Sequence, residues 1–158
     1  MSAPPFPSEE NDFLFEHIAL LRASFKHWFN RELLPERMTD TEAARYAFNA
    51  PWALLSHSTD KDPLFNYANQ TALSLFGMTW EEMTTFPSRL SVEKTARESR
   101  IKLLEEVAAH GCVEGYRGIR IGPHGRRFEI QGTHIWNVRD AFGKPCGQAA
   151  SFKHWIWL

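Results

Sequence analysis

The chain has 158 residues, of which 43% are hydrophobic and 23% are charged, and its formal net charge is −1 at pH 7. This length suits one domain with a substantial core, and the 12 Phe and 6 Trp exclude a disordered chain. The balanced charge excludes an electrostatic nucleic-acid binder, which would need a basic excess.

Residues 1–10 are acidic and rich in proline, and they predict a disordered tail before a single domain over residues 11–158. This tail lacks the basic start and apolar stretch of a signal peptide, and no apolar run approaches the ~18 residues of a membrane span. The spacing of Cys112 and Cys146 fits no zinc motif, and we interpret both as reduced thiols. These features predict a cytoplasmic protein that binds neither a membrane nor a metal.

The first helix is expected from Asp12 to Phe29, within an N-terminal helical extension over residues 11–36. Its apolar residues recur at steps of four and three, close to a coiled-coil seam. Because two heptads are too short to stand alone, this stripe must pack on its own sheet or on a second copy of the chain. The stripe consists of Leu14, Ile18, Leu21, Phe25 and Trp28.

The middle of the chain alternates short strands and helices. A helix is expected over residues 40–49, strands over 52–58 and 64–68, a short helix capped by Asn69 and ended by Gly77, and a capping box at Thr79 and Glu82. A longer helix is expected from Ser91 to His110, with Ile101, Leu104, Val107 and Ala108 on one face and charges opposite.

The last third predicts a meander of three strands, over residues 113–121, 126–138 and 146–156. In the second of these strands, strict alternation places Phe128, Ile130, His134, Trp136 and Val138 on one face. The fold class is therefore α+β, with a five-stranded antiparallel sheet, helices on one face and the extra N-terminal helix.

This order of elements resembles the PAS fold, most clearly in LFNYANQTALSLFGMTWEEM, Leu64 to Met83. More narrowly, the strings AARYAFNAPWALLSHSTDKDPLFNYAN, FGMTWEEMTTFPSRLS and the late CGQAASF are similar to the MEKHLA family, a PAS-like group, from about Phe13 to Phe152. That family includes stand-alone bacterial proteins, which this chain resembles, and the C-terminal domain of class III plant homeodomain leucine-zipper proteins. The resemblance implies the fold and a sensory role, and it transfers neither DNA binding nor a ligand.

A candidate pocket lies between the sheet and the helices in a PAS-like fold. His134 is expected to face it, either as a ligand contact, as a haem ligand, or as a structural histidine satisfied by a neighbour. The aromatic residues around it either line this pocket or form a filled core. The candidate set is His134, Trp136, Phe128, Ile130, Tyr67, Phe65, Phe76, Trp52 and His57.

The cofactor is unknown from the sequence. The region TTFPSRLSVEK has no cysteine where the flavin-binding LOV subclass of PAS domains carries one, which argues against LOV-type photochemistry. Haem and non-covalent flavin remain open. Arg117, Arg120, Arg126 and Arg127 cluster near one hairpin, either as solvated strand ends or as a phosphate- or carboxylate-binding patch.

The C-terminal string FKHWIWL alternates apolar residues to both sides of its strand, which predicts that the strand is covered twice. This favours a homodimer that uses Trp155 and Trp157 together with the stripe of the first helix.

Three functions follow from these patterns. The first is a sensor that binds a small molecule and signals through a separate partner protein. The second is a ligand-free dimerisation or protein-interaction module. The third is an acid–base enzyme with His134 as the base, which is disfavoured because alternation places no carboxylate on the face of His134.

Overall fold

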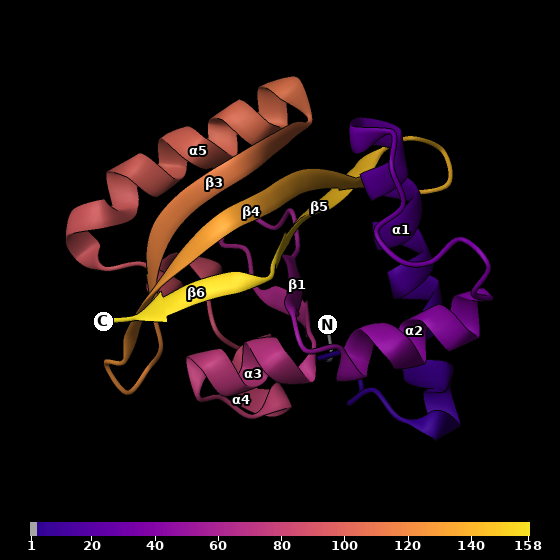
Figure 1. Cartoon of the computed structure of the whole chain (residues 1–158). Coiled ribbons are helices and arrows are strands. Elements are labelled where there is room, and N and C mark those ends of the chain that lie inside the picture. Colours follow the sequence, from indigo (N-terminus) through magenta and orange to yellow (C-terminus); the bar gives the residue numbers. More distant parts are fainter. Residues whose placement is uncertain (1–2) are drawn as a thin grey trace.

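The computed structural model describes residues 3–158. Its elements, in chain order, are η1 (Glu9–Leu14), α1 (Phe15–Phe29), α2 (Asp40–Asn49), β1 (Ala53–His57), β2 (Phe65–Ala68), α3 (Gln70–Phe76), α4 (Trp80–Thr84), η2 (Ser88–Ser91), η3 (Lys94–Ala96), α5 (Arg97–His110), β3 (Cys112–Ile121), β4 (Arg127–Arg139), β5 (Pro145–Phe152) and β6 (His154–Trp157). Figure 1 shows α5 lying along β3, with α1 and α2 at the other end of the sheet.

The sheet is antiparallel with the strand order β2-β1-β5-β4-β3, and β6 pairs with β4 beyond the end of β5. β5 and β6 meet β4 in one continuous register, since His134 pairs with Ser151 and Gln131 pairs with His154. Only Lys153 separates the two strands. The predicted five-stranded α+β fold is therefore confirmed, with its last strand interrupted once.

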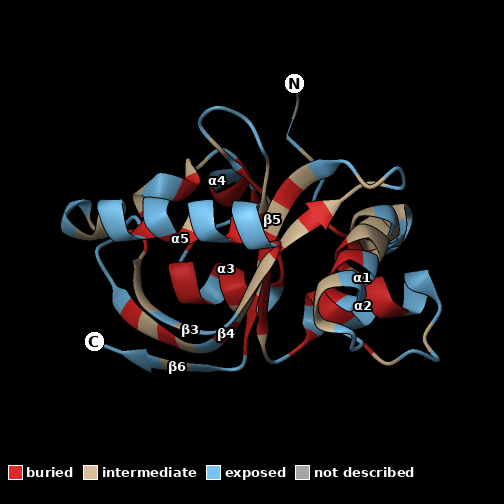
Figure 2. Cartoon of the chain, turned by 90° about the horizontal axis from the view of Figure 1, so that it is seen from above, coloured by how far each residue is buried: buried red, intermediate tan, exposed pale blue. Residues whose placement is uncertain are grey.

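The register defines the two faces of the sheet, because directly paired residues point to the same side. One row joins Leu55 to Ala150, and Ala150 to Ile135, on the face towards α5. Leu54 and Ser151 belong to a row on the opposite face, towards α1. Figure 2 shows α1 and α2 on the far side of β5 from α3 and α5. The PAS-like helices thus cover one face, and the N-terminal extension covers the other.

Asn69 connects three elements of the core. Its Oδ1 accepts from the backbone N–H of Ala72 at 3.0 Å, which caps α3, and from that of Leu54 at 3.2 Å. Its Nδ2 donates to the carbonyls of Ala47 at 3.0 Å and Trp52 at 2.7 Å. The cap that the sequence predicts is confirmed, and the same side chain also fixes α2 and β1 beside α3.

The other predicted caps of this region are present as well. Thr79 and Glu82 form the expected capping box of α4. Gly77 ends α3 in the left-handed region with φ of 65°.

The N-terminal helix α1 begins at Phe15 and not at Asp12. Asp12, Phe13 and Leu14 have φ of 50°, 54° and 58°, so the chain turns through a left-handed segment before the helix. The side chains of Ile18, Leu21 and Phe25 are buried within the chain itself, in the main core. These three cannot serve the expected dimer interface, and Leu14 and Trp28 also pack on this core.

The first residues differ from the expected disordered tail. The ring of Phe6 packs edge-on against Phe48 and Trp80, with centroids 5.5 and 6.1 Å apart. The indole Nε1 of Trp80 donates to the carbonyl of Pro4 at 2.8 Å. The segment from Pro4 onward is therefore packed on the fold, while the part of the predicted tail at residues 1–2 lies outside the described residues.

Within residues 3–158, the structure contains no helix that is both long and apolar enough to cross a membrane.

Candidate functional site

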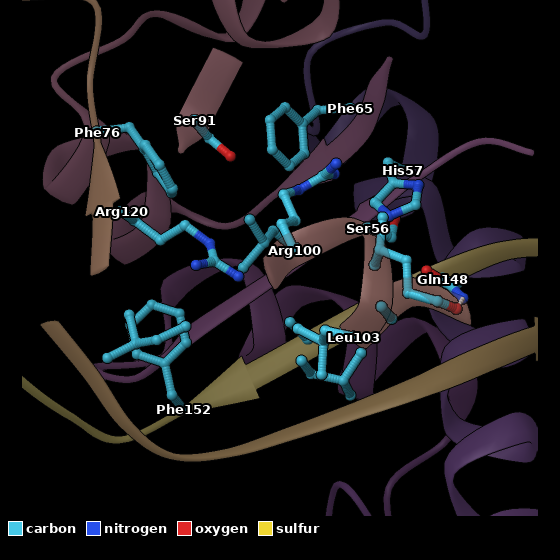
Figure 3. A pocket seen from close by; sticks show the side chains of 16 residues that line it. Ser56, His57, Phe65, Phe76, Ser91, Arg100, Leu103, Arg120, Gln148 and Phe152 are labelled. Carbon is cyan, nitrogen blue, oxygen red and sulfur yellow. Dashed lines mark hydrogen bonds between the residues drawn. The ribbon is translucent and has the colours of Figure 1, made fainter. Parts of the chain in front are cut away.

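A cavity of about 60 Å³ lies between the inner face of the sheet and α5. Its walls are mostly apolar, and they come from α3, α5 and five strands of the sheet. The apolar side chains are Leu55, Phe65, Phe76, Leu103, Leu104, Ile130, Ile135, Ala149, Ala150 and Phe152. Figure 3 shows the Arg120 side chain extending into this ring of residues, and the Arg100 guanidinium on the side of Phe65 and His57.

Two arginines supply the charge of the cavity. Arg100 of α5 is only 9% exposed, and its guanidinium donates to the hydroxyl of Ser88 at 2.8 Å. Arg120 of β3 donates to the hydroxyl of Tyr116 at 3.3 Å and to the carbonyl of Ile119 at 3.0 Å. Within the described residues, neither guanidinium lies in an ion pair with a carboxylate.

These charges act on one another through a low-dielectric interior. Burial, and then the positive charge of Arg120, lowers the pKa of Arg100 to about 10, so Arg100 stays protonated at neutral pH. Burial also holds the pKa of His57 below its usual range, and the charge of Arg100 adds to this effect. His57 is therefore neutral at pH 7, and its Nδ1 lies 2.9 Å from the carbonyl of Ser58.

The last turns of α5 are fixed to the sheet by two amides. Gln148 of β5 donates to the carbonyl of Leu104 at 3.4 Å, and it also donates to Asn137 Oδ1 at 3.1 Å. Asn137 of β4 donates to the carbonyl of Val107 at 3.0 Å. Because these carbonyls lie near the end of the helix, the amides hold this end of α5 while Arg100 holds the start.

The structure brings together some of the nine candidates that the sequence suggested. Ile130, Phe65, Phe76 and His57 line the cavity. Phe128 lies behind them, with its ring centroid 5.1 Å from that of Phe76. The remaining four candidates lie elsewhere.

His134 and Trp136 face α1, which corrects the expected alternation along β4. The ring of Phe25 lies 5.6 Å from His134 and 5.0 Å from Trp136. The cause is Gly132, which has φ of 59° and interrupts the pleat, so that Ile130 and Ile135 both face the cavity. A haem ligand or general base at His134 facing the cavity is therefore wrong.

His134 instead lies at the surface beside an ion pair of Arg31 and Glu114. Its Nε2 lies 3.1 Å from Glu114 Oε1 and 2.9 Å from Arg31 Nη2, and Arg31 pairs with Glu114 at 2.6 Å. The expectation that no carboxylate lies beside His134 is wrong, because Glu114 comes from the neighbouring strand. The pKa of Glu114 lies below its usual range, and the main cause is the hydrogen bond from Arg31. This carboxylate therefore stays ionised.

Tyr67 and Trp52 are also away from the cavity. Tyr67 is buried on the α1 side, with its ring 5.7 Å from His17 and 5.9 Å from Trp80. Trp52 borders a shallow surface hollow that it shares with His134.

Arg100 is a site residue that the sequence pattern did not indicate. The pattern predicts Ile101 on the inner face of the long helix, but Ile101 is 53% exposed, and the helix begins at Arg97 instead of Ser91. The inner face consists of Arg100, Leu103, Leu104 and Val107, whose spacing of three, four and seven residues was the available signal.

Arg120 belongs to the cluster of four arginines noted in the sequence, and the four side chains have different partners in the structure. Arg117 pairs with Glu129 at 3.4 Å, and Arg127 pairs with Glu93. Arg126 lies over the ring of Trp157, 3.9 Å from its centroid. Only Arg120, among these four, lines the cavity.

The cavity does not fit a large cofactor. Its volume of about 60 Å³ is well below the ~300 Å³ at which pockets for drug-sized ligands begin. Neither Cys112 nor Cys146 lines the cavity, so neither thiol is placed to react with a flavin bound there, as LOV-type photochemistry requires. Burial raises the pKa of both thiols, which keeps them protonated.

Comparison with solved structures shows the fold. An RNA-binding light-oxygen-voltage receptor matches with a TM-score of 0.62 and 20% identity over 75% of this chain, which spans about a third (34%) of that receptor. The PAS domain of a protein from Colwellia psychrerythraea matches with a TM-score of 0.58 and 12% identity, covering 68% of this chain and 90% of that one. A LOV protein from Rhodobacter sphaeroides matches with a TM-score of 0.57 and 13% identity, and the match covers 90% of this chain and 67% of that protein.

No curated protein matches the chain. The model of the MEKHLA domain matches residues 15–157, which is nearly the whole length. The expected family is confirmed by this match and by the PAS-type sheet with its helical cover. The chain therefore belongs to the MEKHLA domain family and has a PAS-like fold.

Proposed function

We propose that this protein is a sensory module that binds a small molecule in the cavity between the sheet and α5 and passes the bound state to a partner protein. One observation carries the proposal. The cavity is bounded by α5, α3 and strands β1, β2, β3, β4 and β5, so that a molecule bound there contacts both layers of the fold. Apolar walls with a few convergent polar groups are the usual composition of a small-molecule site.

α5 is the element that would respond to the ligand. It contributes Arg100, Leu103 and Leu104 to the cavity. It packs on the sheet through a small cluster formed by Leu103, Val107 and Ile135, separate from the main core. A ligand that prefers one position of α5 would shift the population of this helix. Ile101 on its outer face is 53% exposed and offers a contact for the partner.

The volume of the cavity favours a compact metabolite over haem or a non-covalent flavin as the bound molecule. The free thiols of Cys112 and Cys146 support a cytoplasmic location, where such thiols stay reduced. The fold family and the absence of an acid–base pair facing the cavity in the described residues favour binding without catalysis.

Native mass spectrometry, with an absorption spectrum, tests the proposal on protein purified without added ligand. We expect a bound small mass that is released on denaturation, and no Soret or flavin band. The Leu104→Trp variant should lose the bound mass, because a larger side chain fills the cavity. Ile101→Trp on the exposed face of the same helix is the matched control. Protein that is free of ligand in every preparation, and whose melting temperature no metabolite mixture raises, contradicts the proposal.

A second candidate function is a homodimeric interaction module. The C-terminal residues Ile156, Trp157 and Leu158 are 52%, 41% and 60% exposed and form an apolar edge on β6. Trp155 and Trp157, from the predicted interface, remain candidates there, with Trp155 partly packed on the core. Sedimentation at micromolar concentration should show a dimer that Ile156→Glu dissociates and Ile101→Glu does not. A monomer in the unmodified protein refutes this candidate.

A further inference from the structure

The cavity contains two positive charges that pair with no carboxylate of residues 3–158. Arg100 and Arg120 come from different elements, α5 and β3, and both side chains line the same space of about 60 Å³. Arg117, three residues before Arg120 on β3, has a carboxylate partner in Glu129 at 3.4 Å. Within the described residues, the two cavity arginines have no such partner.

Hydrogen bonds to the described part of the chain engage only a minority of the donors of these two arginines. A guanidinium has five N–H donors. Arg100 uses Nη2 towards Ser88, and Arg120 uses Nη1 towards Tyr116 and Ile119. A buried cation without a counter-charge is costly, and Arg100 is only 9% exposed. The lowered pKa of Arg100, due to burial and to Arg120, reflects this cost.

An anion in the cavity would offset this cost for Arg100 and pair with Arg120 at the same time, because guanidinium groups bind carboxylates and phosphates through paired N–H donors. The remaining walls decide between these two chemistries. The polar side chains of Ser56, His57, Ser91 and Gln148 also line the cavity, and each is already hydrogen-bonded to a protein group. The rest of the wall is apolar, and Phe65, Phe76, Leu103 and Phe152 offer no hydrogen-bonding side-chain atom. Phosphate oxygens turned towards these walls would be desolvated without a partner, whereas the hydrocarbon part of an organic acid would be well placed there.

We propose that the cavity binds a short-chain monocarboxylic acid, with its carboxylate held by Arg100 and Arg120 and its hydrocarbon part against Phe65 and Phe76 (Figure 3). This inference rests on the proposed function and specifies its ligand class. The volume limits the acid to a few heavy atoms. The carboxylate links α5 to β3, so binding draws the start of α5 towards the sheet.

Calorimetry and thermal melting at constant ionic strength test the ligand class with four probes: butyrate, its neutral analogue butyramide, pyruvate and inorganic phosphate. We expect butyrate or pyruvate to bind and to raise the melting temperature, while butyramide and phosphate do not. Equal binding of butyramide overturns the role of charge. Binding of phosphate without either carboxylate overturns the carboxylate class.

Substitutions then assign the two arginines. Arg100→Met and Arg120→Met should each weaken carboxylate binding by about tenfold or more, the loss expected for a charge-assisted hydrogen bond. Arg100→Lys keeps the charge but lacks the planar fork, and its affinity should be intermediate. Arg117→Met, on the strand of Arg120 but outside the cavity, should bind as the unmodified protein does. Unchanged binding in both Arg100→Met and Arg120→Met overturns the proposal.

The melting temperature of the ligand-free variants separates a binding role from a structural one. We expect Arg100→Met to melt at the same or a higher temperature, since it removes a buried charge without a counter-ion. A lower melting temperature with retained carboxylate binding would make Arg100 a structural anchor of Ser88 and overturn its assignment. If Arg100→Met does not fold, Arg120→Met carries the test. A neutral molecule in the native mass spectrum would refute this inference and leave the proposed function standing.

Discussion

His17 is a half-buried histidine at the contact between α1 and the sheet. Its Nε2 lies 2.8 Å from the hydroxyl of Ser56, which in turn donates to Asn66 Oδ1 at 2.6 Å. Burial lowers the pKa of His17 from its ordinary value of 6.5 to about 4. The folded protein therefore holds His17 neutral in the pH range where the unfolded chain begins to bind a proton.

This difference predicts that the free energy of unfolding falls as the pH drops from 6.5 towards 4. The unfolded state binds more protons there, so the contribution of His17 is fully present above pH 6.5 and is lost by about pH 4. The expected loss is about 3 kcal/mol at 1.36 kcal/mol per pH unit. Urea denaturation at pH 7, 6, 5 and 4 measures it.

His17→Gln keeps a hydrogen bond to Ser56 but cannot bind the proton, so its stability should fall less steeply with pH. The slope should not vanish, because burial lowers the pKa of His57 as well. His154→Gln replaces an exposed histidine and serves as the control. Equal pH slopes in His17→Gln and the unmodified protein would contradict the prediction.

At the residue scale, the sequence predicted several apolar residues that line the cavity, but it did not predict the buried arginine. Ile130, Phe65 and Phe76 line the cavity as the PAS resemblance implied, whereas Arg100 was counted with the solvated charges of its helix. A charged residue on an amphipathic helix is normally exposed, so spacing alone could not reveal that Arg100 lies on the inner face. Ligand binding by any of these residues stays a prediction.

At the scale of the element, β4 is divided into two halves by Gly132. Ile130 faces the cavity in the half before Gly132, and Ile135 faces it in the half after Gly132. The paired strand is interrupted at the same level, since Lys153 separates β5 from β6 opposite Gly132 without a change of register. The two interruptions keep the pairing intact while they rotate both strands. His134 consequently lies on the α1 face, against Phe25 and Phe29.

This geometry predicts that Gly132→Val destabilises the protein by about 1–2 kcal/mol, because a φ of 59° is unfavourable for a residue with a branched side chain. Gly132→Asn should cost less, since asparagine tolerates the left-handed region. No atom within 4 Å would contact an added Cβ at Gly132, so the difference reports backbone strain and not a clash. Chemical denaturation of both variants measures it. Similar losses for valine and asparagine would contradict this account.

The alternation of β4 was predictable from the sequence only within each half. A glycine inside a strand pattern is a known sign of a bulge, and Gly132 was that sign. The sequence does not show whether the alternation of inward and outward side chains continues unchanged past Gly132 or is reversed there. For the same reason, Trp155 and Phe152 approach each other across Lys153, with ring centroids 6.1 Å apart, although strict alternation would separate them.

At the scale of the whole molecule, the PAS-like sheet and the MEKHLA family were predictable because long strings of the chain carry the resemblance. The position of α1 was not predictable from the sequence, because an amphipathic stripe has the same spacing whether it packs on a sheet or on a second subunit. The structure places the stripe on the outer face of the sheet, where Phe25 packs edge-on against Trp136 at 5.0 Å. Both faces of the sheet are thus covered by helices of one chain (Figure 2).

This arrangement predicts that Phe25→Ala lowers the free energy of unfolding by about 3–5 kcal/mol, the range for a phenylalanine removed from a packed core. Phe25 is 5% exposed and contacts Phe29, His134 and Trp136, all within the same chain. The loss should therefore be the same at low and high protein concentration. Phe142→Ala, at a turn residue that is 96% exposed, should change stability little. A loss that shrinks as the protein is concentrated would show instead that the stripe is shared between subunits, because association then contributes to stability by mass action.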